Sequence, residues 1–361
     1  MITPRSQLAI ARIIPFCIIW SISSLVYTFL ERGILGTLDY YPSTGNPYNF
    51  VNNLFITTAM ASVTGLIIGS VEVFYLSRLL IKRSFVEKML VKVLIYFTII
   101  VAFLFGSSVA ANAFQLNVSL TDRAVWKNAG LFLSTFSFWG VGIFISYGIV
   151  ISLFFDEVSG SLGSGVLNNF FRGKYHKPIE EDRIFMFLDM QSSTKIAESM
   201  GHAKYFQMLK EYFADLTEPI IDYGGEIYQY VGDEIVISWK VVNGIGTNNC
   251  IECFLAMKLR LKNMEDKYIQ AFGVLPKFKA GLHIGRVTTG EIGVIKREII
   301  FTGDVLNTSA RIQSLCNNYN VEILMSAQLF NSLERASLPA IRLIGEVELR
   351  GRDEKVFLYT L

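Results

Sequence analysis

The chain has 361 residues, of which 52% are hydrophobic, and its mean hydropathy is +0.40. That length is sufficient for two domains, and such an apolar composition excludes an ordinary soluble protein, so part of the chain is expected in lipid. The formal net charge of +2 gives no argument for a nucleic-acid partner, because binding a phosphate backbone requires clustered Lys and Arg.

Four uncharged stretches in the first half meet or approach the length of about 20 apolar residues that a helix needs to cross a bilayer. They are Ile13–Leu30, Val51–Val71, Val93–Thr121 and Ala129–Phe155. We expect the helical core of the third stretch to end near Phe114. Residues 1–155 are therefore predicted to form a four-helix transmembrane domain.

The positions of the cations predict the orientation of these spans. Arg5 and Arg12 precede the first span, whereas the first and third connections carry few basic residues. The second connection contains Arg78, Lys82, Arg83, Lys88 and Lys92. Because cytoplasmic loops are enriched in Lys and Arg, both termini are expected in the cytoplasm, with the chain in the inner or plasma membrane. Glu72 ends the second span, where we expect its carboxylate to reach the interface.

Charged residues return from Asp156 onward, and the Gly- and Ser-rich segment 159–165 predicts a coupling linker over 156–180. Residues 181–361 alternate strand-like runs with amphipathic helices in the order βαββαβ plus added elements, which predicts a ferredoxin-like α+β domain. The expected strands are Arg183–Met190, two within Gly225–Trp239, Lys277–Ile284, Arg297–Phe301, Val321–Met325, Arg342–Arg350 and Lys355–Leu361, and the expected helices are Thr194–Tyr223, Asn248–Phe272 and Val305–Tyr319.

Two aspartates occupy strand ends in this half. Asp189 ends an apolar strand, and Asp233 lies beside Gly232 in a turn between two strands. In a ferredoxin-like sheet these points are adjacent, and we expect few basic side chains nearby to pair them. Two adjacent carboxylates are suited to a pair of Mg²⁺ ions bridging phosphate oxygens. A simple turn aspartate is the alternative for Asp233 alone, and the pairing favours a metal site.

Asn307 and Arg311 lie four residues apart in a predicted helix, directly after the Gly303-Asp304 turn. This spacing places an amide and a guanidinium on one helix face. Such a face can hold a ribose and a phosphate, since Arg offers a charge-assisted fork to charge that develops on phosphorus. The same pair on an ordinary helix is usually solvated surface.

Four segments in chain order carry a family resemblance. They are Phe187-Leu-Asp-Met-Gln-Ser-Ser-Thr194 with Ala197-Glu198, Gly224-Gly-Glu-Ile-Tyr-Gln-Tyr-Val-Gly-Asp-Glu234, Gly281-Leu-His-Ile-Gly285, and Thr302-Gly-Asp-Val-Leu-Asn-Thr-Ser-Ala-Arg311. Together they resemble the successive motifs of the class III adenylate/guanylate cyclases. The resemblance covers Arg183–Leu361 and implies a class III cyclase catalytic domain over residues 181–361.

The resemblance implies roles for individual residues. Asp189 and Asp233, helped by the backbone carbonyl of Met190, would bind two Mg²⁺ or Mn²⁺ ions. Asn307 would orient the ribose, and Arg311 would stabilise the transition state. Arg350, in Leu349-Arg-Gly351, matches a basic position used for the triphosphate. In such enzymes one subunit supplies the metals and the other the base, ribose and Arg contacts, so a head-to-tail homodimer is expected.

Two positions depart from the family pattern. The purine is usually read by a Lys four residues before the second metal-binding Asp, and by an Asp or Thr three residues before the Gly of the last motif. Here these positions hold Gln229 and Ile300. Gln can donate and accept hydrogen bonds, whereas the Ile side chain can do neither. ATP is favoured as the substrate, and GTP or a pyrimidine triphosphate stays open.

The sequence therefore predicts a membrane-bound nucleotide cyclase that forms a 3′,5′-cyclic nucleotide and pyrophosphate for intracellular signalling. Two alternatives come from other classes. One is a membrane receptor or scaffold with a catalytically silent cyclase-like half, which retention of Asp189, Asp233, Asn307 and Arg311 disfavours. The other takes Val231-Gly-Asp-Glu234 as a diguanylate cyclase turn, which the Asn307/Arg311 helix disfavours.

Overall fold

The computed structural model describes residues 3–37, 39–40, 48–80, 83–116, 118–162, 174–295, 297–334, 338, 340–349 and 355–361. The chain divides into two compact units, one formed by residues 8–165 and the other by residues 166–361 with the first seven residues. Each unit is described by itself.

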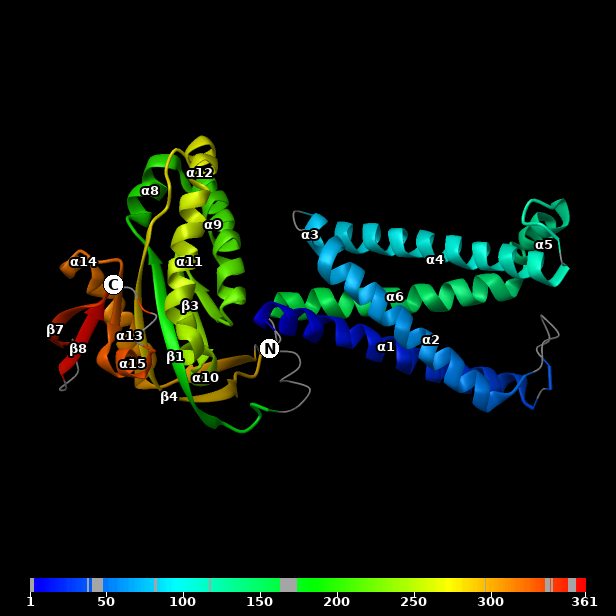
Figure 1. The fold of residues 1–361 in the computed structure, drawn as a ribbon, viewed down its shortest axis with the longest axis horizontal. Helices are drawn as coiled ribbons and strands as arrows, with labels where there is room; N and C mark the ends of the chain where they lie inside the picture. Colours follow the sequence, from blue (N-terminus) through cyan, green and yellow to red (C-terminus); the bar gives the residue numbers. More distant parts are fainter. Residues whose placement is uncertain are drawn as a thin grey trace. The chain divides into compact units, whose positions relative to one another are not determined.

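Helices form the whole regular structure described in the first unit (Figure 1). Their bounds are α1 (Pro4–Leu35), α2 (Phe50–Val71), η1 (Glu72–Leu76, a π-helical turn), α3 (Ser77–Leu79), α4 (Phe85–Leu116), α5 (Arg123–Leu133) and α6 (Phe136–Leu162). Among the described residues, four helical stretches are long and apolar enough to cross a membrane: Pro4–Leu35, Phe50–Leu76, Phe85–Ala110 and Phe138–Gly160. The four predicted apolar helices are thus present.

The predicted fourth span is divided in the structure. Residues 129–133 belong to the short helix α5, and α6 starts only at Phe136. The Thr135 hydroxyl accepts a hydrogen bond from the backbone N–H of Phe138 at 3.3 Å, which is N-cap behaviour that starts a new helix. The apolar run continues across this break, so the sequence did not predict it.

Glycines allow α1 and α2 to approach closely. A Cβ on Gly65 would lie 2.7 Å from the carbonyl oxygen of Phe16, and one on Gly69 would lie 3.1 Å from the Phe16 side chain. Small residues permit such contacts between apolar helices, which have no hydrophobic driving force between them in lipid. One buried cluster of this unit draws side chains from all four long helices: Phe16, Trp20, Ile68, Tyr96, Ile149 and Leu153.

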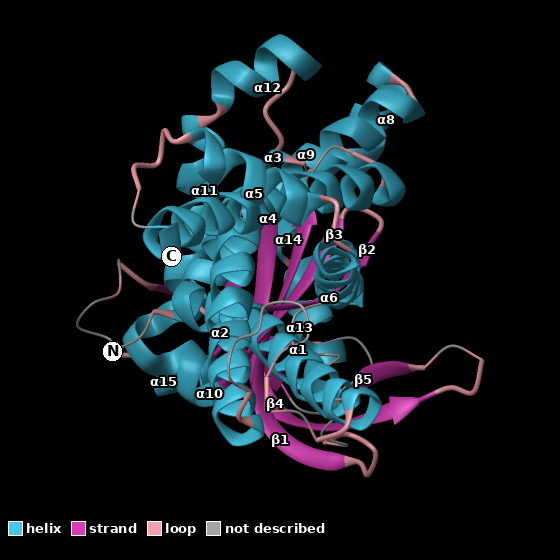
Figure 2. Cartoon of the chain, turned by 90° about the vertical axis from the view of Figure 1, so that its right-hand side faces the viewer, coloured by secondary structure: helices cyan, strands magenta, loops and turns pink. Residues whose placement is uncertain are grey.

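A mixed sheet with helices on both faces forms the second unit. The strands are β1 (Ile179–Met190), β2 (Glu226–Val231), β3 (Glu234–Lys240), β4 (Phe278–Ile292), β5 (Glu298–Thr302), β6 (Ile323–Ser326), β7 (Arg342–Glu348) and β8 (Lys355–Thr360). Their order is β2-β3-β1-β4-β6-β8-β7, and β5 pairs with β4. The β2-β3-β1-β4 segment has the antiparallel ferredoxin-like arrangement, and β4 pairs with β6 in parallel. Figure 2 shows β1 and β4 running side by side.

The helices of this unit are α8 (Ser193–Met200), α9 (His202–Asp222), α10 (Val241–Ile245), η2 (Gly246–Asn248), α11 (Asn249–Asn263), α12 (Glu265–Phe272), α13 (Asp304–Ser314), α14 (Cys316–Tyr319) and α15 (Ala327–Ser332). The three predicted helices are therefore each divided into two. In the first case Gly201, with φ of +81°, separates α8 from α9. A glycine accepts this left-handed conformation at little cost, so it ends one helix where periodicity alone predicted a continuous one.

The alternation of β1 explains why both faces of the sheet are covered. Ile184, Met186 and Leu188 pack in the core that includes residues of α9 and α11, which lie beside one another in Figure 1. Phe185 and Phe187 point to the opposite face, where they pack with Val305 of α13. Because successive side chains of a strand point to opposite faces, an apolar strand without alternation indicates a sheet buried on both sides.

Candidate active site

Asp189 and Asp233 lie close together at one end of the sheet. Asp189, next to last in β1, pairs in register with Glu234 at the beginning of β3. Asp233 immediately precedes Glu234, in the turn where Gly232 adopts a φ of +62°. That left-handed residue closes the β2–β3 hairpin tightly and so fixes Asp233 beside the end of β1. The adjacency follows from strand order, and the role of the two residues as metal ligands stays a prediction.

The electrostatics of this pair favour a bound cation. Burial raises the pKa of Asp189 above its ordinary value, and the neighbouring Asp233 carboxylate raises it further. Burial, with Asp189 and Asp233, also raises the pKa of Glu234 to about 7. The Oδ2 atom of Asp233 is buried without a hydrogen-bond partner among the described residues. A divalent cation near the two aspartates would stabilise the ionised form of Asp189 and give the orphaned Asp233 oxygen a partner.

The described residues contain no group of three or more His, Cys, Asp or Glu side chains arranged to hold a metal ion. A metal bound here would therefore need ligands besides the two aspartates, such as a backbone carbonyl, water or phosphate oxygens. Mg²⁺ is commonly held in this way, by one or two carboxylates plus substrate phosphates. Met190, whose carbonyl was predicted to help, follows Asp189 directly and ends β1.

The expectation that few basic groups lie near the aspartates is wrong. The Nζ atom of Lys279 is 3.3 Å from the Asp189 Oδ2 atom, and the Gln313 amide donates a hydrogen bond of 3.2 Å to the same oxygen. Lys279 occupies the β4 position directly opposite Asp189. Gln313 reaches it from α13, the helix that covers this face of the sheet. Only strand pairing and helix packing bring these partners together, although Lys279 lies just two residues before the Gly281 motif.

Asn307 and Arg311 are on α13 but face away from the Asp189 carboxylate of their own chain. Asn307 is exposed and Arg311 is half-buried, and neither side chain has a polar partner in the described part of the chain. Gln313, which contacts Asp189, follows Arg311 by two residues, which is a rotation of about 200° around a helix axis. Arg311 therefore lies on the opposite side of α13 from the residue that contacts Asp189, and Asn307 is exposed to solvent.

The two predicted base-reading positions lie near one another on β2 and β5. Their sequence neighbours Tyr228 and Phe301 are in contact, with ring centroids 4.9 Å apart. The Phe301 backbone N–H also donates to the Tyr228 hydroxyl at 3.3 Å. Gln229 is exposed and Ile300 is half-buried. Arg350, the predicted triphosphate contact, lies outside the described residues.

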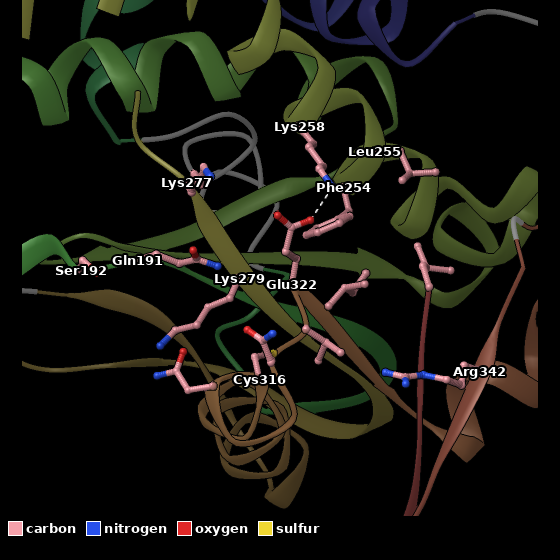
Figure 3. A pocket seen from close by; sticks show the side chains of 15 residues that line it. Gln191, Ser192, Phe254, Leu255, Lys258, Lys277, Lys279, Cys316, Glu322 and Arg342 are labelled. Atoms are coloured by element: carbon pink, nitrogen blue, oxygen red, sulfur yellow. Dashed lines mark hydrogen bonds and ion pairs between the residues drawn. The ribbon is translucent and has the colours of Figure 1, made fainter. Parts of the chain in front are cut away.

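A pocket of about 950 Å³ begins directly after Met190 (Figure 3). Gln191 and Ser192 contribute to its wall, and Lys279 connects it with Asp189. Lys277, Lys258 and Arg342 add positive charge, and Lys258 forms an ion pair with Glu322. Neither Asp189 nor Asp233 lines this pocket, and its excess of cations is suited to an anionic group such as a phosphate.

Comparisons with known proteins agree with this geometry. A family model described as the adenylate and guanylate cyclase catalytic domain matches residues 176–361. Adenylate cyclase 2 of Rhizobium meliloti (strain 1021) is 34% identical over 209 residues, which are 58% of this chain and 58% of that protein. The adenylate cyclase of Anabaena cylindrica is 28% identical over 180 residues, which are 48% of this chain and 35% of that protein. The chain thus spans about half or less of the length of these relatives.

Among solved structures, that of a bacterial light-regulated adenylyl cyclase matches with a TM-score of 0.54. The match covers 63% of this chain and 66% of that chain at 19% identity, which supports the fold alone. Because the family model covers more than half of the residues, the chain belongs to the adenylate and guanylate cyclase catalytic domain family, the class III cyclases.

Proposed function

We propose that this chain is a membrane-anchored nucleotide cyclase that converts a nucleoside triphosphate, most favourably ATP, into the 3′,5′-cyclic monophosphate and pyrophosphate. The observation that carries this proposal is the Asp189–Asp233 carboxylate pair at adjacent strand ends of a cyclase-family sheet. The cationic pocket supports it as well, since its wall includes Lys279, which forms an ion pair with Asp189 and could contact a phosphate group.

The residues present fit two divalent cations. The orphaned oxygen of Asp233 and the raised pKa of Asp189 are both relieved by positive charge between the two carboxylates. Mg²⁺ or Mn²⁺, when bound, supplies the charge that makes the ribose 3′-hydroxyl a better nucleophile and neutralises the triphosphate. Asp189 and Asp233 hold that charge in place. Lys279, no longer needed by Asp189, is then free to contact phosphate oxygens in the pocket.

The reaction requires no protein nucleophile. The 3′-hydroxyl oxygen attacks the α-phosphorus in line, the bond to the leaving pyrophosphate breaks, and the hydroxyl proton is released. Arg311 stabilises the negative charge that develops on the phosphoryl group, and Asn307 orients the ribose. Truncating Arg311 is expected to lower turnover by about 10²–10³-fold, as loss of an oxyanion-type donor does.

We infer that the functional unit is a head-to-tail homodimer. Asn307 and Arg311 point away from the carboxylates of their own chain, so they would serve the site of a second copy. The β4–β5 hairpin adds an apolar surface for such a partner: Val294 is 92% exposed and Ile295 is 103% exposed. Exposed apolar side chains next to one another on a hairpin are typical of an interaction surface.

The dimer proposal is tested by mixing two inactive variants. Asp233→Ala removes a metal ligand, and Arg311→Ala removes the group supplied to the partner. Each variant alone is expected to be inactive yet dimeric. An equal mixture should recover about one quarter of wild-type activity, because half of the random dimers are heterodimers with one intact site. A mixture that stays inactive after subunit exchange, verified by differently tagged copies, would show that the site is not shared.

The base specificity rests on Gln229 and Ile300, which replace the usual adenine-reading pair. A glutamine amide accommodates more than one base edge, so GTP and pyrimidine triphosphates are the second candidate substrates. The experiment incubates the purified full chain with Mn²⁺ or Mg²⁺ and each of the four ribonucleoside triphosphates, and identifies products by mass spectrometry. ATP is expected to give the most cyclic product. No cyclic product from any triphosphate would refute the catalytic proposal and favour a silent receptor or scaffold.

The proposed topology places both termini and the catalytic domain in the cytoplasm, with four spans in the inner or plasma membrane. The Arg12–Asp156 ion pair supports one part of it, because it places the beginning of the first helix and the end of the fourth at the same membrane face. The basic residues before the first span and in the second connection support a cytoplasmic assignment for that face. Reporters fused after Leu361 are expected to be active only in the cytoplasm, and an active periplasmic or extracellular fusion would contradict the topology.

A further inference from the structure

Six charged side chains meet inside the membrane unit, which we call the charge cluster. All of them lie within the helices that are long and apolar enough to span a membrane. They come from the beginning of α1, the end of α2 with η1, the beginning of α4 and the end of α6, which Figure 1 shows at one end of this unit. The cluster consists of Arg12, Glu72, Lys88, Lys92, Asp156 and Glu157.

Glu72 and Lys92 form the centre of the charge cluster. Their side chains are 0% and 3% exposed, and the Lys92 ammonium lies 2.5 Å from the Glu72 carboxylate. Ser77 donates to one oxygen of that carboxylate at 3.0 Å, and the Tyr96 hydroxyl donates to the other at 3.3 Å. The Glu72 carboxylate is therefore buried between helices, with partners from α3 and α4.

The outer pairs connect α6 to the other helices. The Arg12 guanidinium binds both oxygens of Asp156, at 3.1 and 2.8 Å, and also donates to Ser77 at 3.4 Å. Lys88 and Lys92 both contact Glu157, at 2.8 and 3.5 Å. The cluster thus contains three cations and three anions, and every charge has an opposite partner. Through it, α6 is attached to α1 and to α4.

Packing alone does not require such a cluster. Replacing a buried ion pair by well-packed apolar residues is often neutral or stabilising, because the charges lose their hydration. Removing one partner of a buried ion pair is in contrast costly, because the other charge is left uncompensated away from water. The π-helical turn at Glu72–Leu76, which begins at the central carboxylate, is a second departure from regular structure at the same place. Such turns in α-helices occur often at functional sites.

We propose that the charge cluster is an ionic latch that holds α6 against α1 and α4 and thereby sets the turnover of the catalytic domain. A movement of α6 can reach the catalytic domain through the chain itself, because α6 ends at Leu162 and the next strand in the sequence, β1, carries Asp189. The inference rests on the proposed cyclase activity for its catalytic readout.

The test uses variants of the full chain in detergent or vesicles. Lys92→Met leaves the buried Glu72 carboxylate without its cation, whereas the double variant with Glu72→Gln removes both charges and keeps the side-chain volumes similar. We expect turnover at saturating triphosphate to fall by about fivefold in the single variant with an unchanged KM, and to recover within about twofold in the double variant. Glu87→Gln, an exposed position on the same helix outside the cluster, is the matched control and should behave as wild type.

A milder pair protects the test against misfolding. Lys88→Met, alone and with Glu157→Gln, perturbs an ion pair whose side chains are 20% and 18% exposed. Hydrogen exchange provides a readout independent of catalysis: the single variants should exchange faster at residues 153–162, with a change at β1, and the double variants should recover. Faster exchange with wild-type turnover would overturn the coupling, and double variants that recover neither property would overturn the latch. If the wild-type chain makes no cyclic nucleotide, the proposed function fails. The latch is then tested by hydrogen exchange at β1 alone, compared between the single and the double variants.

Discussion

Gly281 is the position at which one added methyl group should disturb the catalytic helix. It lies on β4, directly beneath the backbone of α13. A Cβ at this residue would be 2.2 Å from the backbone nitrogen of Gln313, 2.5 Å from its Cα and 2.6 Å from the carbonyl oxygen of Ser309. These are backbone atoms, so no side-chain rotation relieves the overlap. Gly281→Ala therefore requires the helix itself to move.

The size of the effect follows from these distances. Ordinary contacts of a Cβ begin near 3.4 Å, so α13 must shift by about 1 Å. Overpacking of this kind typically costs about 1–3 kcal/mol of stability. A displacement of about 1 Å at reacting groups can lower turnover by about 100-fold. Because α13 carries Asn307, Arg311 and Gln313, we expect both a lower melting temperature and a loss of turnover of that order.

Gly285→Ala is the matched control on the same strand. Its Cβ would lie 3.2 and 3.3 Å from the Val305 side chain and 3.9 Å from the His283 ring, which requires a few tenths of an ångström of adjustment. We expect turnover within a few-fold of wild type and a loss of stability below about 1 kcal/mol. The measurements are thermal unfolding and cyclase turnover well below the melting temperature. A Gly281→Ala protein with wild-type turnover, or one no worse than Gly285→Ala, would refute the link between α13 placement and catalysis.

Three further predictions concern the site itself. Lys279→Met removes a cation from the pocket wall and from Asp189. KM for the triphosphate should therefore rise about tenfold, which is the loss typical of one charged hydrogen bond. An unchanged KM would contradict a contact between Lys279 and the phosphate groups. Glu234 has a folded-state pKa of about 7 against an ordinary value of 4.5, so in metal-free protein the stability that its proton provides is complete below about pH 4.5 and is lost as the pH rises through 7. Glu234→Gln should flatten this fall in melting temperature, and an identical pH profile in both proteins would count against the raised pKa. Gln229→Lys combined with Ile300→Asp restores the usual adenine-reading pair and should raise kcat/KM for ATP over GTP by at least about tenfold, measured as competing products; no change would remove these positions from base recognition.

The sequence by itself determined the membrane helices and the order of the catalytic elements. Uninterrupted apolar runs predict spans because a bilayer core requires a minimum length of apolar helix. The βαββαβ order likewise predicted the β2-β3-β1-β4 arrangement, and with it the neighbourhood of Asp189 and Asp233. These features are local, or follow from the few ways in which strands connect.

Helix ends were less predictable. The division of the fourth apolar stretch before Phe136 and the break at Gly201 were missed, since an apolar run continues across the first and an amphipathic pattern across the second. A single cap or a single left-handed residue decides such breaks, and periodicity averages over it.

Tertiary structure alone decided which side chains meet. Lys279 and Gln313 reach Asp189 because strand register and helix packing join segments far apart in the sequence. Arg311 faces the opposite way from Gln313 because α13 rests on the sheet by one particular face. Glu72, at the end of the second apolar stretch, is buried beside Lys92 of another helix, with 2.5 Å between the ammonium and the carboxylate. Hydropathy reports how costly a charge is in lipid, and only the packing of helices shows whether that charge has a partner.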